Sequence, residues 1–143
     1  STLFDLGITD VLNCASELNR KTDELAKQTE HKIRRHNLAP GDDVNALRDW
    51  EKQDLASFFD ASYELIDRIV TSKECVLVHC QRGKSRSATM VIYYMMRKNQ
   101  WSLAKTMLFL YEKRPEICPN LSFYRQLEEV EKKLYSYNLL RRI

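Results

Sequence analysis

The sequence predicts a single α/β domain, and three patterns support that fold class. Residues 75–79 (CVLVH) form a mostly apolar run, which is typical of a strand covered on both faces. Residues 87–96 are apolar nearly all round, which indicates a helix buried in the centre of the domain. Residues 55–70 repeat apolar side chains at spacings of three, four and seven, as an amphipathic helix does. Because strands alternate with helices along 143 residues, the usual size of one domain, we expect one α/β unit.

The first half of the sequence predicts shorter elements. Residues 1–6 look like the end of a helix that stops at Gly7, and residues 8–13 (ITDVLN) like a short buried strand. Because the sequence opens inside a helix and without a methionine, we expect residues 1–143 to be a domain excised from a longer protein. Residues 44–47 are interpreted as a short edge strand that follows a turn.

A densely charged segment, residues 16–36, has few apolar anchors. We expect it to form a solvated helix or a surface loop. The part near residues 20–40 either recognises a partner or is a solvated insertion, and the sequence leaves both open.

Helix boundaries are clearer in the second half. Asp54 and Ser102 are interpreted as N-caps, and the helix that Ser102 begins ends before Pro115. The last helix begins near Asn120. Its apolar stripe consists of Phe123, Leu127, Val130 and Leu134.

Composition excludes several classes of protein. The net charge of +3 gives no argument for a nucleic-acid partner. Four cysteines without a CxxC pair predict neither a disulfide framework nor a zinc site. No apolar run approaches the ~18 residues of a membrane span. We expect a protein of a reducing compartment, the cytoplasm and also the nucleus.

The chemistry is concentrated in residues 79–87, HCQRGKSRS. A buried strand ends at Cys80 and Arg86 opens a buried helix, so the chain must turn tightly and its N–H groups can converge on one anion. Gly83 allows a positive φ or a close backbone approach, and Arg86 can donate two N–H bonds to a phosphate. The candidate phosphate-binding residues are Gln81, Arg82, Gly83, Lys84, Ser85 and Arg86.

Cys80 lies at the bottom of this positively charged loop. Such surroundings lower a cysteine pKa from ~8.5 into the range of ~3.5–7.5, and a thiolate that faces a bound phosphate can attack phosphorus to give a phosphocysteine. The alternative is a buried structural cysteine that merely ends a strand. The whole strand–loop–helix context favours the nucleophile.

The pattern His-Cys-x-x-Gly-x-x-Arg-Ser resembles the signature of the cysteine-dependent protein tyrosine phosphatases, and residues 85–89 (SRSAT) with 94–96 (YMM) resemble their dual-specificity branch, the MAP kinase phosphatases in particular. The similarity covers about three quarters of the sequence, from Gly7 to about Leu134. It implies a central, mostly parallel twisted sheet flanked by helices, without the family's N-terminal strand in this sequence, and a site at a strand's carboxyl end. It also implies that residues 1–143 are one catalytic domain.

The same resemblance assigns roles. Cys80 matches the nucleophile and Arg86 the residue that binds the phosphate and the transition-state oxygens. Ser87 matches the hydroxyl that helps the thiolate depart, although it could be a helix cap. His79 matches the residue that orders the loop, a role close to that of an ordinary core histidine. Asn120 matches an asparagine that braces the loop, and it could simply cap the last helix.

The general acid must protonate the leaving group, and such groups contribute typically ~10²–10⁴ in rate. Asp49 matches the family position. Asp54 is the rival, but its capping role explains it without catalysis. We expect no metal and no cofactor, because Arg86 and backbone dipoles supply the charge stabilisation.

Together these features predict a dual-specificity protein phosphatase that acts on phosphotyrosine and phosphoserine or phosphothreonine, with a phosphorylated protein, a MAP kinase, as partner. Arg82 and Lys84 make the loop strongly basic, and phosphoinositide phosphatases of the superfamily also carry lysine there. A phosphoinositide or other non-protein phosphatase is therefore one alternative. A phosphoprotein-binding module with little activity is the other, and the presence of Cys80, Arg86 and Asp49 argues against it.

Overall fold

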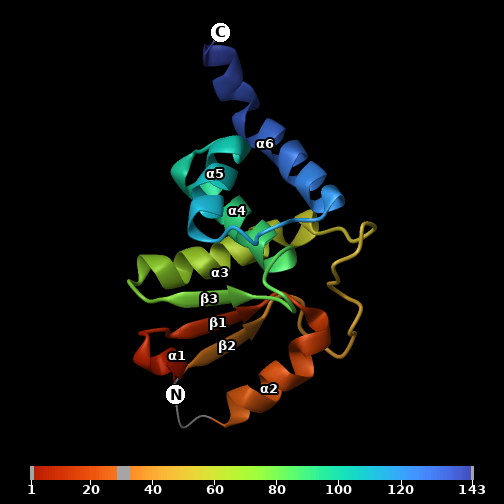
Figure 1. Ribbon diagram of the computed structural model, residues 1–143, viewed down its shortest axis with the longest axis vertical. Helices are drawn as coiled ribbons and strands as arrows, with labels where there is room; N and C mark the ends of the chain where they lie inside the picture. The colour runs from red at the N-terminus through yellow and green to blue at the C-terminus, as the bar shows by residue number, and fades with distance from the viewer. Residues whose placement is uncertain (1, 29–32, 143) are drawn as a thin grey trace.

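Three parallel strands form the sheet at the centre of the computed structural model, which describes residues 2–28 and 33–142 (Figure 1). They are β1 (Asp10–Asn13), β2 (Arg34–Asn37) and β3 (Val76–His79), in the order β2-β1-β3. Both pairings are parallel, and Asn13 at the end of β1 lies opposite Asn37 and His79. The carboxyl ends of the three strands therefore meet at one edge of the sheet.

Helices lie on both sides of the strands. In Figure 1, α2 lies beyond β2, whereas α3 to α6 gather beyond β3. None of the helices in residues 2–28 and 33–142 is long and apolar enough to cross a membrane. The helices are α1 (Thr2–Asp5), α2 (Asn19–Lys27), α3 (Phe59–Thr71), α4 (Arg86–Asn99), α5 (Leu103–Lys113) and α6 (Leu121–Arg142), with short 3-10 helices at Ser16–Leu18 and Ala56–Phe58.

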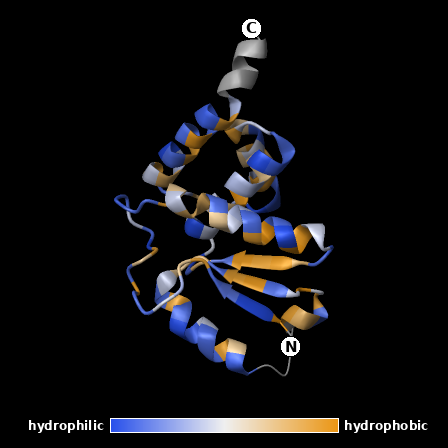
Figure 2. Ribbon diagram, turned by 180° about the vertical axis from the view of Figure 1, so that it is seen from behind, coloured by the Kyte–Doolittle hydropathy of each residue, from blue (hydrophilic) through white to orange (hydrophobic). Residues whose placement is uncertain are grey.

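Helix α4 is the central helix, as the sequence predicts. It packs against β3 and against α3, α5 and α6. Met90, Ile92 and Met96 are fully buried, and each such side chain contributes roughly 1.5–3 kcal/mol by burial. Figure 2 shows apolar residues in the helical layer around it. The loop that precedes α4 is therefore anchored to the buried centre of the domain.

The edge strand was predicted at the wrong place. Residues 44–47 form turns, and the strand beside β1 is β2 at Arg34–Asn37, inside the charged segment. Arg34 and His36 lie next to the buried carboxylate of Asp10 in β1, at 2.8 Å each. Because the side chains that face the neighbouring strand are charged, β2 lacks the apolar alternation that indicates a strand.

The first part of the charged segment forms a helix, as the sequence predicts. Helix α2 covers its first part, and residues 29–32 lie outside the described residues. The described parts of the segment therefore contain a helix and an edge strand of the fold.

Strand β3 is less covered than its apolar sequence predicts. Leu77 is 36% exposed, and Val76 and Val78 are only partly buried. The reason is that β1 is the only strand paired with β3 among the described residues. This three-stranded sheet agrees with the expected absence of an N-terminal strand.

Several predicted boundaries are confirmed by their capping bonds. The Ser102 hydroxyl accepts from the Lys105 N–H at 3.1 Å, and the Asn120 side chain accepts from the Phe123 N–H at 2.9 Å. Asp54 accepts from the Ser57 N–H at 3.2 Å, in the 3-10 turn that leads into α3. Each cap satisfies a backbone donor that the first turn of a helix leaves unpaired.

Candidate active site

Residues 80–85 connect the carboxyl end of β3 to the first residue of α4. Gly83 has φ +70°, a conformation that side chains rarely adopt. A Cβ at this position would also lie 2.9 Å from Nη2 of Arg114, so the end of that arginine side chain would have to move. The loop thus takes the tight path that the sequence predicts for an anion-binding turn at a helix N-terminus.

Cys80 begins this loop and is 8% exposed. Its Sγ accepts a hydrogen bond from the Gly83 N–H and lies next to the Ser87 hydroxyl, each at 3.2 Å. Burial alone would raise the pKa of Cys80. The Ser87 hydroxyl, the N–H groups of Ser87 and Gly83 and the Arg86 charge outweigh burial, so the pKa of Cys80 lies below its usual value. A thiolate is therefore stabilised at the bottom of the loop.

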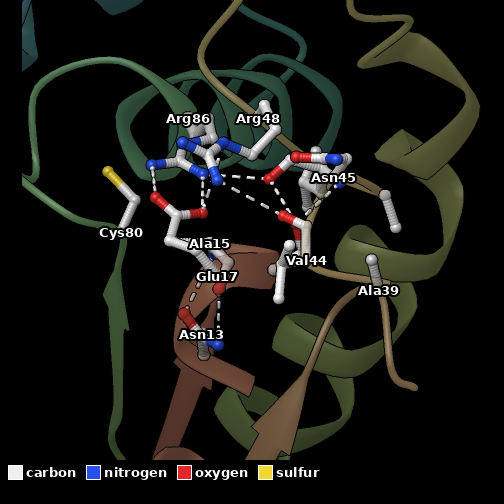
Figure 3. Close-up of polar contacts among 12 residues, drawn as sticks. Asn13, Ala15, Glu17, Ala39, Val44, Asn45, Arg48, Cys80 and Arg86 are labelled. Carbon is white, nitrogen blue, oxygen red and sulfur yellow. Dashed lines mark hydrogen bonds and ion pairs between the residues drawn. The ribbon is translucent and has the colours of Figure 1, made fainter. Parts of the chain in front are cut away.

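Arg86 lies beside Cys80 with its side chain almost completely buried. Its Nη1 and Nη2 donate to the two carboxylate oxygens of Glu17, at 2.6 and 2.7 Å, and Nη1 also donates to the Leu47 carbonyl at 2.9 Å (Figure 3). Burial lowers the pKa of Arg86, but the charges of Glu17, Cys80 and Asp49 raise it overall. Arg86 is thus a fixed cation next to the thiol.

A cavity of about 490 Å³ opens above Cys80 and Arg86. It is large enough for a phosphate and part of the group that carries it. Most of the predicted phosphate-binding residues line it, whereas Gly83 contacts the cysteine from below. The lining residues are Glu17, Arg48, Asp49, Trp50, Cys80, Gln81, Arg82, Lys84, Ser85, Arg86 and Cys118.

The two candidate acids are separated by the structure. Asp49 lines the cavity, and its Oδ1 accepts a hydrogen bond from Nδ2 of Asn120 at 2.9 Å. Asp54 does not line the cavity and instead caps the turn before α3. The geometry therefore favours Asp49 as the carboxyl that can reach a leaving group.

The three supporting residues also lie around the loop. Asn120 contacts it through its backbone N–H, which donates to the Ser85 hydroxyl at 3.0 Å, and its side chain caps α6. Ser87 does not cap α4, because its hydroxyl is directed at Cys80. His79 Nδ1 lies 3.4 Å from the Cys80 carbonyl, and burial lowers the pKa of this imidazole. The surroundings of His79 therefore favour the neutral imidazole.

Arg82 and Lys84 are exposed at the mouth of the cavity. Within residues 2–28 and 33–142, neither side chain has an ion-pair or hydrogen-bond partner, whereas the Lys84 carbonyl accepts from the Cys118 N–H at 2.6 Å. They leave positive charge available to an approaching anion. The described residues contain no group of three or more His, Cys, Asp or Glu side chains that could hold a metal ion.

Sequence reasoning missed Glu17, Arg48, Trp50 and Cys118 as residues of the cavity. Glu17 lies in the charged segment and looks like any solvated acid in the sequence. One signal could have found it: Glu17 follows the carboxyl end of β1, and the carboxyl ends of adjacent parallel strands meet at one edge.

Comparison with known proteins identifies a family and relatives that share this sequence pattern. The family model described as the catalytic domain of dual specificity phosphatases matches residues 1–133. Human dual specificity protein phosphatase 16 is 46% identical over 77 residues, which cover 54% of this chain and 12% of that protein. Dual specificity protein phosphatase 1 of Arabidopsis thaliana is 41% identical over 86 residues, which cover 60% of this chain and 43% of that protein. The chain thus matches less than half the length of either relative.

Solved structures show the same fold. The crystal structure of human DUSP28 superposes with a TM-score of 0.73 at 24% identity, covering 93% of this chain and 80% of that one. The crystal structure of DUSP15 gives a TM-score of 0.73 at 21% identity, covering 99% of this chain and 83% of that one.

Proposed function

The chain belongs to the dual specificity phosphatase catalytic domain family, and on this basis we propose that it hydrolyses phosphotyrosine and phosphoserine or phosphothreonine in protein substrates. The observation that carries the proposal is the pairing of a stabilised thiol with a buried cation under one cavity. Cys80 has a lowered pKa, and Arg86 lies beside it with Nε buried and without a partner among the described residues. A phosphate bound there would supply that partner.

In the first step the Cys80 thiolate attacks phosphorus. The S–P bond forms as the ester P–O bond breaks, and the leaving oxygen takes a proton from Asp49 at the mouth of the cavity. The backbone N–H groups of the loop and Arg86 stabilise the oxygens on which charge develops. The products of this step are a phosphocysteine and the substrate protein, whose tyrosine, serine or threonine side chain now carries a free hydroxyl.

In the second step water attacks the phosphocysteine. Asp49, now a carboxylate, accepts the proton of that water, and the S–P bond breaks to return the thiolate. Ser87 lies 3.2 Å from Sγ and can donate a hydrogen bond to the departing thiolate. Both steps use the residues of this chain without a metal.

Hydrolysis of a small aryl phosphate with EDTA present tests the proposal. We expect turnover by the wild-type domain and loss of at least 10³-fold in Cys80→Ser, because a serine hydroxyl is far less acidic than the thiol. An inactive wild type would leave the domain as a phosphoprotein-binding module. Equal rates in the two proteins would contradict a cysteine nucleophile.

For the physiological substrate we propose a phosphorylated MAP kinase, supported by the resemblance of residues 85–89 and 94–96 to the MAP kinase phosphatases. The cytoplasm or nucleus is the proposed location, because a low-pKa thiol persists in a reducing compartment. Release of phosphate from doubly phosphorylated MAP kinases, compared with unrelated phosphoproteins at equal concentration, tests the substrate.

A phosphoinositide substrate is the second candidate, because Arg82 and Lys84 present unpaired positive charge at the mouth of the cavity. If a lipid head group is the substrate, Lys84→Ala reduces its turnover much more than that of an aryl phosphate. Equal losses on both would favour the protein substrate.

A further inference from the structure

Trp50 is an aromatic side chain in the wall of the cavity above Cys80. It directly follows Asp49 in the sequence, lines the same cavity as Cys80 and Arg86, and is 49% exposed. A single exposed apolar side chain is ordinary on a protein surface. The position of this indole, beside a reactive thiol and next to the candidate acid, places its open surface where a bound substrate can cover it.

The backbone of Trp50 is fixed by hydrogen bonds within its loop. The Trp50 carbonyl accepts from the Gln53 N–H at 3.0 Å, and the Gln53 side chain accepts from the Arg48 N–H at 2.9 Å. Gln53 is attached in turn to α6, because its carbonyl accepts from Nε2 of Gln126 at 2.9 Å. The loop that carries Trp50 is therefore closed on itself and joined to the helical layer.

The indole ring is held by a neighbouring cation. The guanidinium carbon of Arg48 lies over the ring of Trp50, 5.1 Å from its centre, within the ~6 Å of a cation–π contact. Arg48 is itself placed by two acceptors, the Glu17 carboxylate at 3.9 Å and the Val44 carbonyl at 3.5 Å. A side chain that is already held loses less conformational freedom when a ligand packs against it. Trp50 is thus a prepared apolar wall.

The neighbouring acid indicates which part of a substrate meets this wall. Asp49 must reach the ester oxygen that leaves, and Cα atoms of consecutive residues are ~3.8 Å apart. The indole therefore lies beside the group that is bonded to that oxygen. In phosphotyrosine this group is an aromatic ring, whereas in phosphoserine and phosphothreonine it is one aliphatic carbon that leads directly to the peptide backbone. An aromatic pair gains ~2–10-fold in affinity beyond the burial of its area.

We propose that Trp50 is a specificity-determining residue: its indole, held by Arg48, packs against the ring of phosphotyrosine and gives the domain a preference for phosphotyrosine over phosphoserine and phosphothreonine. The inference rests on the proposed function and deepens it by naming the preferred phosphoamino acid. Two other roles make different predictions. An indole that only holds the loop affects all substrates equally, and an indole that enters a lipid surface beside Arg82 and Lys84 responds to vesicles.

A binding experiment tests the contact without turnover. Phenylphosphonate and methylphosphonate are titrated into the Trp101→Phe variant, in which Trp50 is the only tryptophan of the two in the sequence. We expect phenylphosphonate to change the fluorescence of Trp50 and to bind ~3–10-fold more tightly than methylphosphonate. By calorimetry, Trp50→Ala should bind the two within about twofold of each other, and Trp50→Phe should keep most of the difference, because it keeps a ring. Equal affinities before the substitution would contradict the proposal.

A kinetic experiment tests the preference. The kcat/KM is measured for a phosphotyrosine peptide and for the same peptide with phosphothreonine. Trp50→Ala should lose ~3–10-fold on the phosphotyrosine peptide and less than about twofold on the other. Trp101→Ala is the matched control and should keep the wild-type ratio. Trp101 is also partly exposed with a cation over its ring, Lys105 Nζ at 4.8 Å, but it lies outside the lining of the cavity.

Equal losses on the two peptides in Trp50→Ala would show that Trp50 only holds the loop, and would overturn the proposal. If Trp50→Ala does not fold, Trp50→Leu carries the same comparison, because it keeps apolar bulk without a ring. Vesicles of phosphatidylcholine and phosphatidylinositol phosphate provide the remaining arm. A shift of Trp50 emission with these vesicles, and none with phenylphosphonate, would overturn the proposal in favour of a lipid surface.

Failure of the proposed function is a separate result. A wild-type domain that binds phenylphosphonate but hydrolyses neither peptide overturns the proposed activity, while the phosphonate series still decides whether Trp50 contacts the ring. An active domain whose two phosphonates bind equally overturns the role of Trp50 alone.

Discussion

The side chain of Asn120 donates a hydrogen bond to the Asp49 carboxylate, with 2.9 Å between Nδ2 and Oδ1. The same residue donates its backbone N–H to Ser85 in the loop and accepts the Phe123 N–H that begins α6. Asn120 thus ties the candidate acid, the anion-binding loop and the last helix together, although Asp49 lies 71 residues away in the sequence.

Asn120→Asp separates these functions. An aspartate still caps α6, so we expect the free energy of unfolding to change by less than about 1 kcal/mol. Its carboxylate repels Asp49 where the amide held it, so phosphothreonine-peptide hydrolysis should fall roughly tenfold, within the range of general acid catalysis. Turnover of an aryl phosphate, which needs the acid less, should fall less. Equal losses on both substrates would contradict the link to Asp49.

Asp49→Ala should slow the hydrolysis of phosphoserine or phosphothreonine peptides by ~10²-fold. Aryl phosphates with a good leaving group should be affected much less, because they depart without a proton. Asp54→Ala is the control: it loses a cap worth about 1 kcal/mol and should show no dependence on the leaving group. If Asp54→Ala alone shows that dependence, the assignment of the acid is wrong.

Ser87→Ala should raise the pKa of Cys80. The Ser87 hydroxyl stabilises the thiolate, and a hydrogen bond to a charged group contributes ~1.5–3 kcal/mol, or about one pKa unit or more. The thiolate then forms at higher pH, so both the alkylation rate and the acid limb of activity should move to higher pH. The measurement is iodoacetamide alkylation against pH in a Cys75→Ser, Cys118→Ser background, since both cysteines are exposed. An equal shift in the exposed Ser72→Ala control would contradict a local cause.

Asp10 should make the domain acid-sensitive. Burial would raise its pKa, but the bonds from Arg34, His36 and Thr9 outweigh burial and lower the pKa from 3.8 to about 2. The unfolded chain therefore binds the proton more readily, so this stabilisation is complete above about pH 4 and is lost as the pH falls toward 2. The shift corresponds to about 2 kcal/mol.

Urea unfolding of the wild type and Asp10→Asn tests this dependence. We expect the variant to be less stable by about 2 kcal/mol at pH 7, with a difference that shrinks below pH 4. Asp5→Asn, in exposed α1, should behave as the wild type. A difference that stays constant down to pH 2.5 would show that Asp10 acts by packing alone.

The sequence predicts well wherever an element depends on neighbouring residues. The caps at Ser102 and Asn120 and the central helix α4 were found because helix ends and apolar periodicity are local. Strand β2 was missed for the opposite reason: its Arg34 and His36 are satisfied by Asp10, which lies on another strand. A charged edge strand has no periodic signal of its own.

The sequence by itself determined the chemistry of the loop. Cys80, Gly83 and Arg86 lie within one strand–turn–helix unit, so their spacing alone places a thiol, a turn and a guanidinium around one anion. The tertiary structure decided how the Arg86 side chain is oriented and which acid lies at the cavity. Glu17 and the Leu47 carbonyl orient Arg86, and Asn120 holds Asp49 over the cavity. These partners come from the end of β1, the turn before α3 and the start of α6, and only the folding of the sheet and helices brings them to one edge.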